Sequence, residues 1–186
     1  MRKVIAAFNF TLDGVCDHTA GLPDADIHDH YTTLLEQGGV ILYGRTTFQL
    51  MEHWRAFLEQ PSEQPSMNAF AKAIDAIPKI VFSHTLKDLT WQSASLAKHT
   101  LKDTVLELKQ QEGAPILVGS RSLILQLMAL DLIDEYQFCI YPVVAGGGLP
   151  LFETTHQRRL LKLINTKTFK SGAIILYYEP LKQQDV

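Results

Sequence analysis

Apolar residues in this chain gather in short runs, which are separated by longer segments of mixed character. Three of these runs, at residues 40–43, 80–82 and 116–118, are continuously apolar, as expected for central strands of a sheet that helices cover on both faces. Several runs are also rich in the β-branched and aromatic residues that favour strands. We predict strands at residues 3–10, 39–43, 79–82, 115–118, 135–141, 165–169 and 173–179.

Segments of helical length lie between most of the first five predicted strands. We expect helices to begin near Ala25, Thr46, Met67, Leu101 and Arg121. This alternation of strand and helix indicates an α/β sandwich. The last two strands follow each other without a helical pattern between them, and residues 170–172 supply a turn. We therefore predict a terminal antiparallel hairpin and a mixed, mainly parallel sheet.

Composition limits the organisation of the chain and its partners. The length of 186 residues is close to that of one domain, so we expect a single domain over residues 1–186. The polar, proline-interrupted segment 59–66 is predicted to be a surface loop. A net charge of −3 without a Lys/Arg-rich run argues against nucleic acid as a partner. Two cysteines without a Cys-x-x-Cys motif, and no stretch near the roughly 20 apolar residues of a spanning helix, lead us to expect a cytoplasmic protein with no membrane partner.

The first candidate site follows the run at 40–43, where the sequence continues as Gly44-Arg45-Thr46-Thr47. In open α/β sheets, ligands bind at the carboxyl ends of strands, where the next helix presents free backbone N–H groups. Gly44 would let the backbone approach a ligand, and Arg45 offers a positively charged fork. The hydroxyls of Thr46 and Thr47 could donate to phosphate oxygens or cap the helix. The alternative is an ordinary capped helix whose arginine is a solvated surface charge.

A second strand exit repeats this chemistry. The run at 116–118 is followed by Gly119, Ser120, Arg121, Ser122 and Leu123, which again combine glycine, small hydroxyls, arginine and a helix start. An anion at such a helix start would be stabilised by the helix dipole and by the arginine. One phosphate cradle is common, whereas two indicate a dinucleotide.

A third strand exit carries Ser83 and His84, which are not diagnostic by themselves because strands often end in a Ser-containing turn. No Gly-x-Gly-x-x-Gly stands between a strand and a helix. A nucleotide would therefore bind differently from one in a Rossmann fold.

Three motifs, in this order, resemble the dihydrofolate reductase-like superfamily: Thr-Leu-Asp-Gly at residues 11–14, Gly-Arg-Thr-Thr-Phe at 44–48 and Val-Gly-Ser at 118–120. The chain is most similar to the branch related to the C-terminal reductase domain of the bifunctional riboflavin biosynthesis enzyme, in stand-alone form. The resemblance runs from Lys3 to about Glu179 and includes the glycine-rich segment 141–152. It implies a three-layer α/β/α domain, a homodimer, and NADPH-dependent reduction of a small heterocycle. A pterin or a 5-amino-6-(5-phosphoribosylamino)uracil-like pyrimidine is the expected substrate class.

The same resemblance implies roles for individual residues along an extended NADPH. Arg45 would lie beside the 2′-phosphate, with Thr46 and Thr47 near the pyrophosphate, and a planar arginine fork favours NADPH over NADH. The remaining predicted contacts are Ser83 and His84 at the adenosine end, Gly44 and Gly119 to Leu123 along the pyrophosphate, and Ala7, Leu12 and Gly14 around the nicotinamide.

The source of the proton is where the chain departs from the family. In true dihydrofolate reductases a Leu-Pro-x-Asp sequence places a carboxylate against the pterin, but here Ala25 stands at that position, between Asp24 and Asp26. Asp13, at the end of the first strand, could bind substrate or organise a proton-donating water, although an Asp-Gly turn is the alternative. We take Asp13 and Asp26 as the catalytic candidates.

Two other groups are poor sites by their spacing. His28 and His30 are two residues apart, so on a helix they point in different directions and do not form a zinc pair; an exposed pair of Asp26 with His30 is the simpler interpretation. We expect no metal. The three glycines at 146–148 are predicted to form a flexible turn, because no helix evidently follows them.

Two other functions remain open. A protein that kept the cofactor cradle but lost catalysis would act as a nucleotide-binding sensor or interaction module, and the displaced aspartates favour that alternative. A flavin-binding reductase would be yellow when purified.

Overall fold

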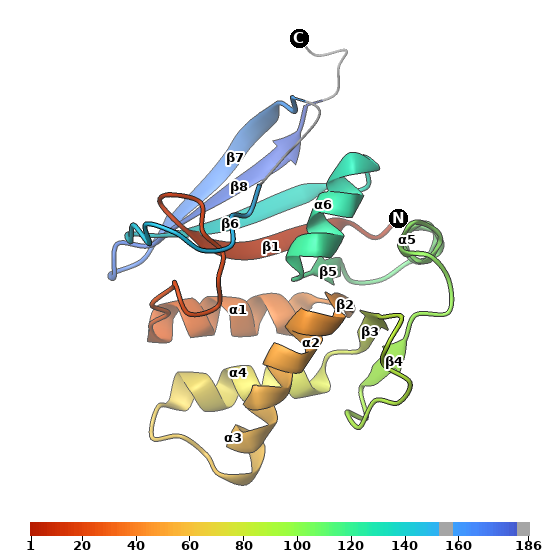
Figure 1. Ribbon diagram of the computed structural model, residues 1–186, viewed down its shortest axis with the longest axis horizontal. Coiled ribbons are helices and arrows are strands. Elements are labelled where there is room, and N and C mark those ends of the chain that lie inside the picture. Colours follow the sequence, from red (N-terminus) through yellow and green to blue (C-terminus); the bar gives the residue numbers. More distant parts are fainter. Residues whose placement is uncertain (153–157, 182–186) are drawn as a thin grey trace.

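The computed structural model describes residues 1–152 and 158–181, which form one eight-stranded sheet with helices packed against it (Figure 1). The strands are β1 Val4–Thr11, β2 Val40–Gly44, β3 Lys79–Phe82, β4 Ala94–Leu96, β5 Ile116–Val118, β6 Glu135–Tyr141, β7 Leu161–Thr168 and β8 Ile174–Pro180. The helices are α1 Ala25–Gln37, α2 Arg45–Met51, the short 3₁₀ helix η1 Glu52–Arg55, α3 Ala56–Glu59, α4 Pro65–Ala76, α5 Leu101–Gln110 and α6 Arg121–Ala129.

The order of strands across the sheet is β4-β3-β2-β5-β1-β6-β8-β7. The strands from β4 to β6 are parallel to their neighbours, whereas β8 runs antiparallel to β6 and β7 antiparallel to β8. Gly172, with φ +86°, lies in the turn that joins β7 to β8. The predicted mixed, mainly parallel sheet with a terminal antiparallel hairpin is therefore confirmed.

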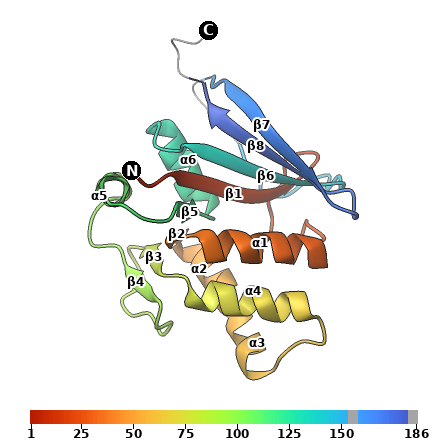
Figure 2. The same ribbon diagram turned by 180° about the vertical axis from the view of Figure 1, so that it is seen from behind.

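Apolar side chains on the two faces of the parallel strands form separate cores. On one face, Val4, Leu42 and Val118 pack with the apolar sides of α5 and α6. On the other face, Ile41 and Leu117 belong to a cluster that α1, α2 and α4 complete. Figure 2 brings α1 and α4 to the front, whereas α6 crosses in front of the sheet in Figure 1. Helices on both faces explain why these strands are continuously apolar.

The structure differs from the predicted elements in four places. Strand β4, with only Ala-Ser-Leu, was not predicted, and β7 begins at Leu161 rather than at Asn165. The helix predicted to start near Thr46 is divided into α2, η1 and α3. Helix α4 begins at Pro65, so the predicted loop 59–66 is shorter at that end. Within the described residues, no helix has both the length and the apolar character needed to cross a membrane.

Candidate functional site

The two glycine-containing strand exits lie side by side. Strands β2 and β5 are parallel neighbours, with Leu42 opposite Val118, so both end at the same edge of the sheet. The backbone N–H of Gly44 donates to the Ser120 hydroxyl at 2.9 Å, and both residues are buried. A Cβ on Gly44 would lie 3.3 Å from the Ser122 hydroxyl, so a larger residue would require Ser122 to shift by a few tenths of an ångström. The structure thus brings the exits together.

The hydroxyls at the two exits differ in whether they are available to a ligand. The Ser120 hydroxyl is occupied by Gly44, and no side chain caps α2 or α6. Thr46 and Ser122 are exposed and Thr47 is half-buried, so their hydroxyls line the edge where the two helices begin. The Leu123 side chain lies in the core, which leaves only its backbone for a ligand.

The third exit is connected to the first through Arg45. Strand β3 is the neighbour of β2. Arg45 Nη1 donates to the Thr85 hydroxyl at 2.9 Å, and the Ser83 hydroxyl accepts from the N–H groups of Thr85 and Leu86 at 3.2 and 3.0 Å. His84 is exposed at this turn. Thr85 was missed in the sequence, although its position two residues after Ser83 at a strand exit was the available signal.

The predicted cofactor residues therefore follow one edge of the sheet. The exits of β3, β2, β5 and β1 are consecutive in the strand order, and neighbouring strands are separated by about 4.8 Å, so the row spans about 14 Å. Ala7 lies on β1 and is half-buried, while Leu12 and Gly14 lie in the loop that leaves β1. Gly14 has φ +82°, a conformation that favours glycine.

Asp13 is held by hydrogen bonds rather than directed at open space. Its carboxylate accepts from the Thr11 hydroxyl at 2.5 Å and from the backbone N–H groups of Ala145 and Gly146 at 3.1 and 2.8 Å. These hydrogen bonds, that of Thr11 first, lower the pKa of Asp13 to about 2. The carboxylate is therefore ionised at neutral pH, and its catalytic role, to bind substrate or organise a proton-donating water, stays a prediction.

The glycine-rich segment 146–148 is an exposed bend that contacts the loop after β1, and its flexibility stays a prediction. The Asp13 carboxylate accepts hydrogen bonds from the N–H groups of Ala145 and Gly146. Gly148 lies so close to Val15 that a Cβ on it would be 2.7 Å from Val15 Cγ1. Beyond it, Arg121 Nε donates to the carbonyl of Pro150 at 2.7 Å. The second exit is thus joined to this loop.

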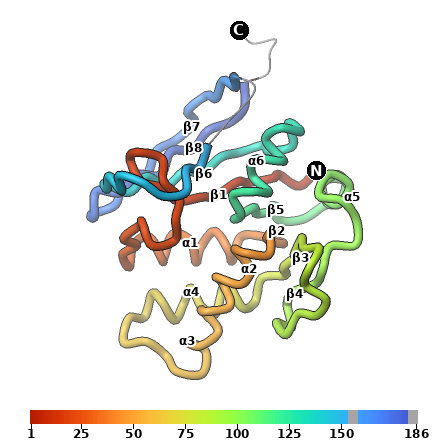
Figure 3. The backbone as a smooth tube through the Cα atoms, in the orientation of Figure 1, coloured from red at the N-terminus to blue at the C-terminus, as the bar shows by residue number. Residues whose placement is uncertain are grey.

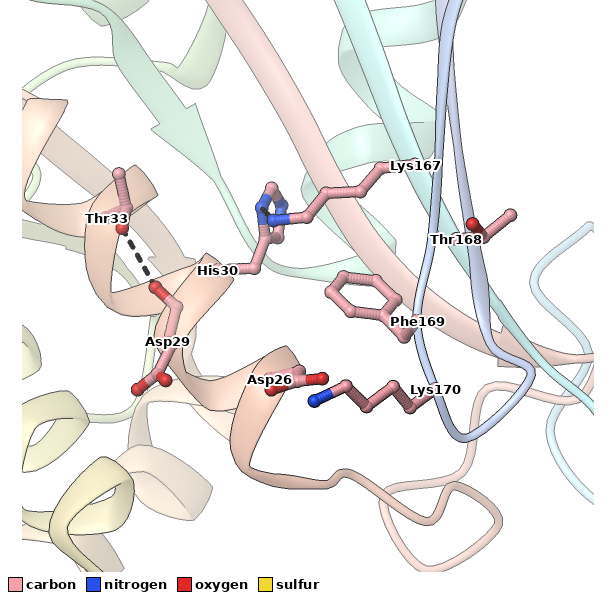
Figure 4. Close-up of a pocket in the computed structure, with 8 residues that line it drawn as sticks. All are labelled: Asp26, Asp29, His30, Thr33, Lys167, Thr168, Phe169 and Lys170. Carbon is pink, nitrogen blue, oxygen red and sulfur yellow. Dashed lines mark hydrogen bonds between the residues drawn. The ribbon is translucent and has the colours of Figure 1, made fainter.

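Asp26 lies elsewhere, in a hollow of about 440 Å³ between α1 and the end of β7 (Figure 4). Asp26, Asp29 and His30 line its helical side, and Lys167 and Lys170 line its other side. Strand β7 is three places from β1, the nearest strand of the cofactor row, which at about 4.8 Å per strand is about 14 Å. Asp26 itself lies in the first turn of α1, and its catalytic role stays a prediction.

His28 and His30 diverge, as their spacing predicts. The His28 ring packs on Trp54 at 5.5 Å between centroids, whereas Lys167 Nζ lies 3.3 Å from His30 Nδ1. Among the contacts of the described residues, His30 contacts Lys167 and does not form the expected pair with Asp26. Burial first, and Lys167 second, lower the pKa of His30 to about 4. In residues 1–152 and 158–181, no group of three His, Cys, Asp or Glu side chains is arranged to hold a metal ion.

A polar network that the sequence did not indicate lies under α1. The Tyr31 hydroxyl donates to Asn9 Oδ1, and Asn9 Nδ2 donates to the Tyr141 hydroxyl at 3.2 Å. Burial raises the pKa values of both tyrosines. These side chains therefore act as neutral hydrogen-bonding groups that join α1 to β1 and β6.

Comparison with known proteins gives a family. The family model described as the RibD C-terminal domain matches residues 2–175. The uncharacterized protein YyaP of Bacillus subtilis strain 168 is 35% identical over 181 residues, which cover 95% of this chain and 94% of YyaP.

Solved structures share the fold at low identity. A putative riboflavin biosynthesis protein from Shewanella sp. PV-4 superimposes with a TM-score of 0.72 at 19% identity and covers 97% of this chain and 99% of its own. Dihydrofolate reductase from Enterococcus faecalis, complexed with NADP(H), has a TM-score of 0.63 at 13% identity and covers 97% of each chain. These structures confirm the dihydrofolate reductase-like fold and nothing finer.

Proposed function

Because the chain belongs to the RibD C-terminal domain family, we propose that it is an NADPH-dependent reductase of a small heterocycle, of the pterin or 5-amino-6-(5-phosphoribosylamino)uracil kind. The observation that carries the proposal is the hydrogen bond from Gly44 to Ser120, which joins two glycine-and-hydroxyl exits into one cradle. A single elongated cofactor can contact both exits only if they are neighbours.

The residues at this edge fit such a cofactor. Gly119 packs closely on the Tyr43 ring, since a Cβ on it would lie 3.1 Å from that ring, so glycine lets the β5 exit lie against β2 beside Gly44. Arg45, already turned toward Thr85, would hold the 2′-phosphate, because a guanidinium fork binds phosphate through paired, charge-assisted hydrogen bonds. Thr46, Thr47, Ser83 and His84 and the segment 119–123 would contact the remaining phosphate and adenosine groups, with Ala7, Leu12 and Gly14 beside the nicotinamide.

NADPH supplies the hydride, and the protein must hold the substrate carbon against it. Asp13 has no proton to give at neutral pH, and Asp26 faces the hollow beside β7. We therefore expect the proton to come from solvent rather than from either aspartate.

Cofactor binding is tested by titrating the protein with NADPH and NADH. Arg45→Ala is expected to weaken NADPH by about tenfold or more, as for the loss of a charge-assisted contact, and to change NADH little, because only NADPH carries the 2′-phosphate. Arg55→Ala is the matched control, since Arg55 donates to Thr90 rather than to Thr85. Equal losses for both cofactors in Arg45→Ala would contradict the role of this residue.

Turnover is tested separately by following NADPH absorbance with pterins, flavins and pyrimidine precursors. Consumption with one of these classes supports a reductase and identifies the substrate class. Tight NADPH binding without turnover would favour the nucleotide-binding sensor, which the positions of Asp13 and Asp26 make the second candidate. Failure to bind NADPH at all would remove the proposal.

A further inference from the structure

We propose that Asp13 is a positioning residue: it fastens the glycine-rich loop 144–150 to the loop after β1 and thereby holds Arg121 and the surface that receives the nicotinamide half of the cofactor. This inference rests on the proposed function and adds to it a residue that acts on one half of the cofactor only. Neither a proton nor a covalent bond is exchanged by Asp13 in this role.

The fastening begins with an oriented carboxylate. Thr11 is fully buried, and its hydroxyl donates to Asp13 Oδ1 while accepting from the N–H of Val15. The two Asp13 oxygens then accept from consecutive N–H groups, those of Ala145 and Gly146. A carboxylate that accepts backbone N–H bonds makes stronger hydrogen bonds than a neutral acceptor. Asp13 is therefore suited to fix the position of a loop rather than to exchange a proton during a reaction.

Backbone hydrogen bonds continue the contact on either side of Asp13. The N–H of Leu12 donates to the carbonyl of Val143 at 2.9 Å, and that of Cys16 donates to the carbonyl of Leu149 at 2.8 Å. Val15 and Pro150 form an isolated antiparallel bridge. Figure 3 shows the two loops running side by side at the ends of β1 and β6. Asp13 is the only side chain whose hydrogen bonds reach Ala145 and Gly146 among the contacts of the described residues.

The fastened loop continues into the cofactor cradle. Pro150, in the bridge with Val15, accepts from Arg121 Nε at 2.7 Å, and Arg121 is the first residue of α6 after Ser120. A shift of the loop would therefore move the acceptor that orients this guanidinium. Among the described residues, no hydrogen bond joins Arg45 or Thr85 directly to the loop 144–150, and the exit of β3 lies about 14 Å from that of β1 along the row of strands.

The same loops present apolar surface without a cover. Leu12 is 65% exposed, Val144 71% and Leu149 44%. These side chains lie on two loops that are tied together, and a ligand placed against them would remove their apolar surface from water. The nicotinamide half of the cofactor is the occupant we assign, because this surface continues into the cradle through Pro150 and Arg121.

The experiment compares two ligands on three variants. NADPH contacts both halves of the site, whereas adenosine 2′,5′-bisphosphate contacts only the end at Arg45. Asp13→Ala is expected to raise the dissociation constant of NADPH by about tenfold or more, as for losing a charged hydrogen-bond acceptor, and to leave that of the bisphosphate within about twofold. Asp13→Asn keeps a neutral acceptor, so its dissociation constant for NADPH should lie between those of wild type and Asp13→Ala.

Asp17→Ala is the matched control. Asp17 is an exposed aspartate in the same loop, and the contacts of its carboxylate, with the N–H and hydroxyl of Thr19 and with His18 Nδ1 at 3.3 Å, stay within that loop. Asp17→Ala should therefore leave the dissociation constants of both ligands unchanged. Hydrogen exchange without ligand provides a second readout, because the amides of Ala145 and Gly146 should exchange faster in Asp13→Ala and Asp13→Asn but not in Asp17→Ala.

The outcomes separate the two proposals. If wild type binds neither ligand, the proposed function fails and this inference fails with it. If wild type binds both, equal weakening of both ligands by Asp13→Ala, or unchanged NADPH binding, overturns the positioning role alone. Unchanged exchange at Ala145 and Gly146 would show that Asp13 does not fasten the loop. Should Asp13→Ala fail to fold, the comparison is made with Asp13→Asn.

Discussion

Replacing Ser120 with alanine removes the acceptor that joins the two strand exits. Ser120 is 1% exposed, and its hydroxyl accepts from the N–H of Gly44 at 2.9 Å. Gly44 is itself buried at the end of β2, so in Ser120→Ala this N–H would lose its partner without reaching water. An unsatisfied buried donor costs about 1–3 kcal/mol, and we expect the free energy of unfolding to fall by about 2 kcal/mol.

Urea denaturation of the protein without ligand measures this loss. With a slope of about 2 kcal/mol per M, a loss of about 2 kcal/mol lowers the midpoint by about 1 M. Ser122→Ala is the control because Ser122 is exposed in the same turn of α6, and its effect should stay below about 0.5 kcal/mol. Equal shifts for the two variants would refute the reasoning, since the bond to Gly44 would then contribute nothing to joining the exits.

Two further predictions concern the α1 side of the molecule. Because the pKa of His30 is lowered from 6.5 to about 4, the unfolded chain binds more protons between those values, and stability should fall as pH falls through that range, by at most about 3 kcal/mol. His30→Asn, which cannot be protonated, should lose less stability than wild type on acidification, and identical pH profiles would contradict this. A Cβ on Gly21 would lie 2.5 Å from the Tyr141 ring, so Gly21→Ala should lower the free energy of unfolding by about 1–3 kcal/mol in thermal or urea denaturation. Gly147→Ala is the control and should leave the free energy of unfolding nearly unchanged, because a Cβ on Gly147 meets nothing within 4 Å. Equal losses for Gly21→Ala and Gly147→Ala would show that the Tyr141 ring moves aside without cost.

Much of the fold could be predicted because the central strands are buried on both faces, and strands of this kind consist of uninterrupted apolar residues. Strand β2 is buried at every position, and its run of apolar residues is visible without a structure. Strand β4 was missed because its three residues, Ala94 to Leu96, include no β-branched or aromatic side chain and are at most half-buried. Strand β7 is exposed along almost its whole length, so pairing with β8, rather than burial, sets where it begins.

The site residues that could be predicted are those that a local sequence pattern identifies, and the misjudged ones depend on distant partners. Glycine and hydroxyl residues directly after strands could be recognised, because parallel strands end at one edge of a sheet. The partners of those residues could not, since they are distant in sequence: Gly44 and Ser120 are 76 residues apart, and Asp13 and Gly146 are 133 apart. Asp13 therefore looked free to take part in chemistry when its oxygens are in fact held by a loop.

Three aspartates near the predicted reaction centre show how partners decide what one residue type does. Asp24 accepts from the N–H of Ile27 and caps α1, Asp13 fastens the glycine-rich loop, and Asp26 lines the hollow opposite Lys170. The resemblance places the family's proton-donating carboxylate at Ala25, between two of these aspartates, and each aspartate has a different environment. In the proposed reduction, the rate depends on how closely the loops hold the nicotinamide against the substrate, because hydride transfer requires that alignment. Loop contacts such as those of Asp13 with Ala145 and Gly146 would then act on turnover through this alignment.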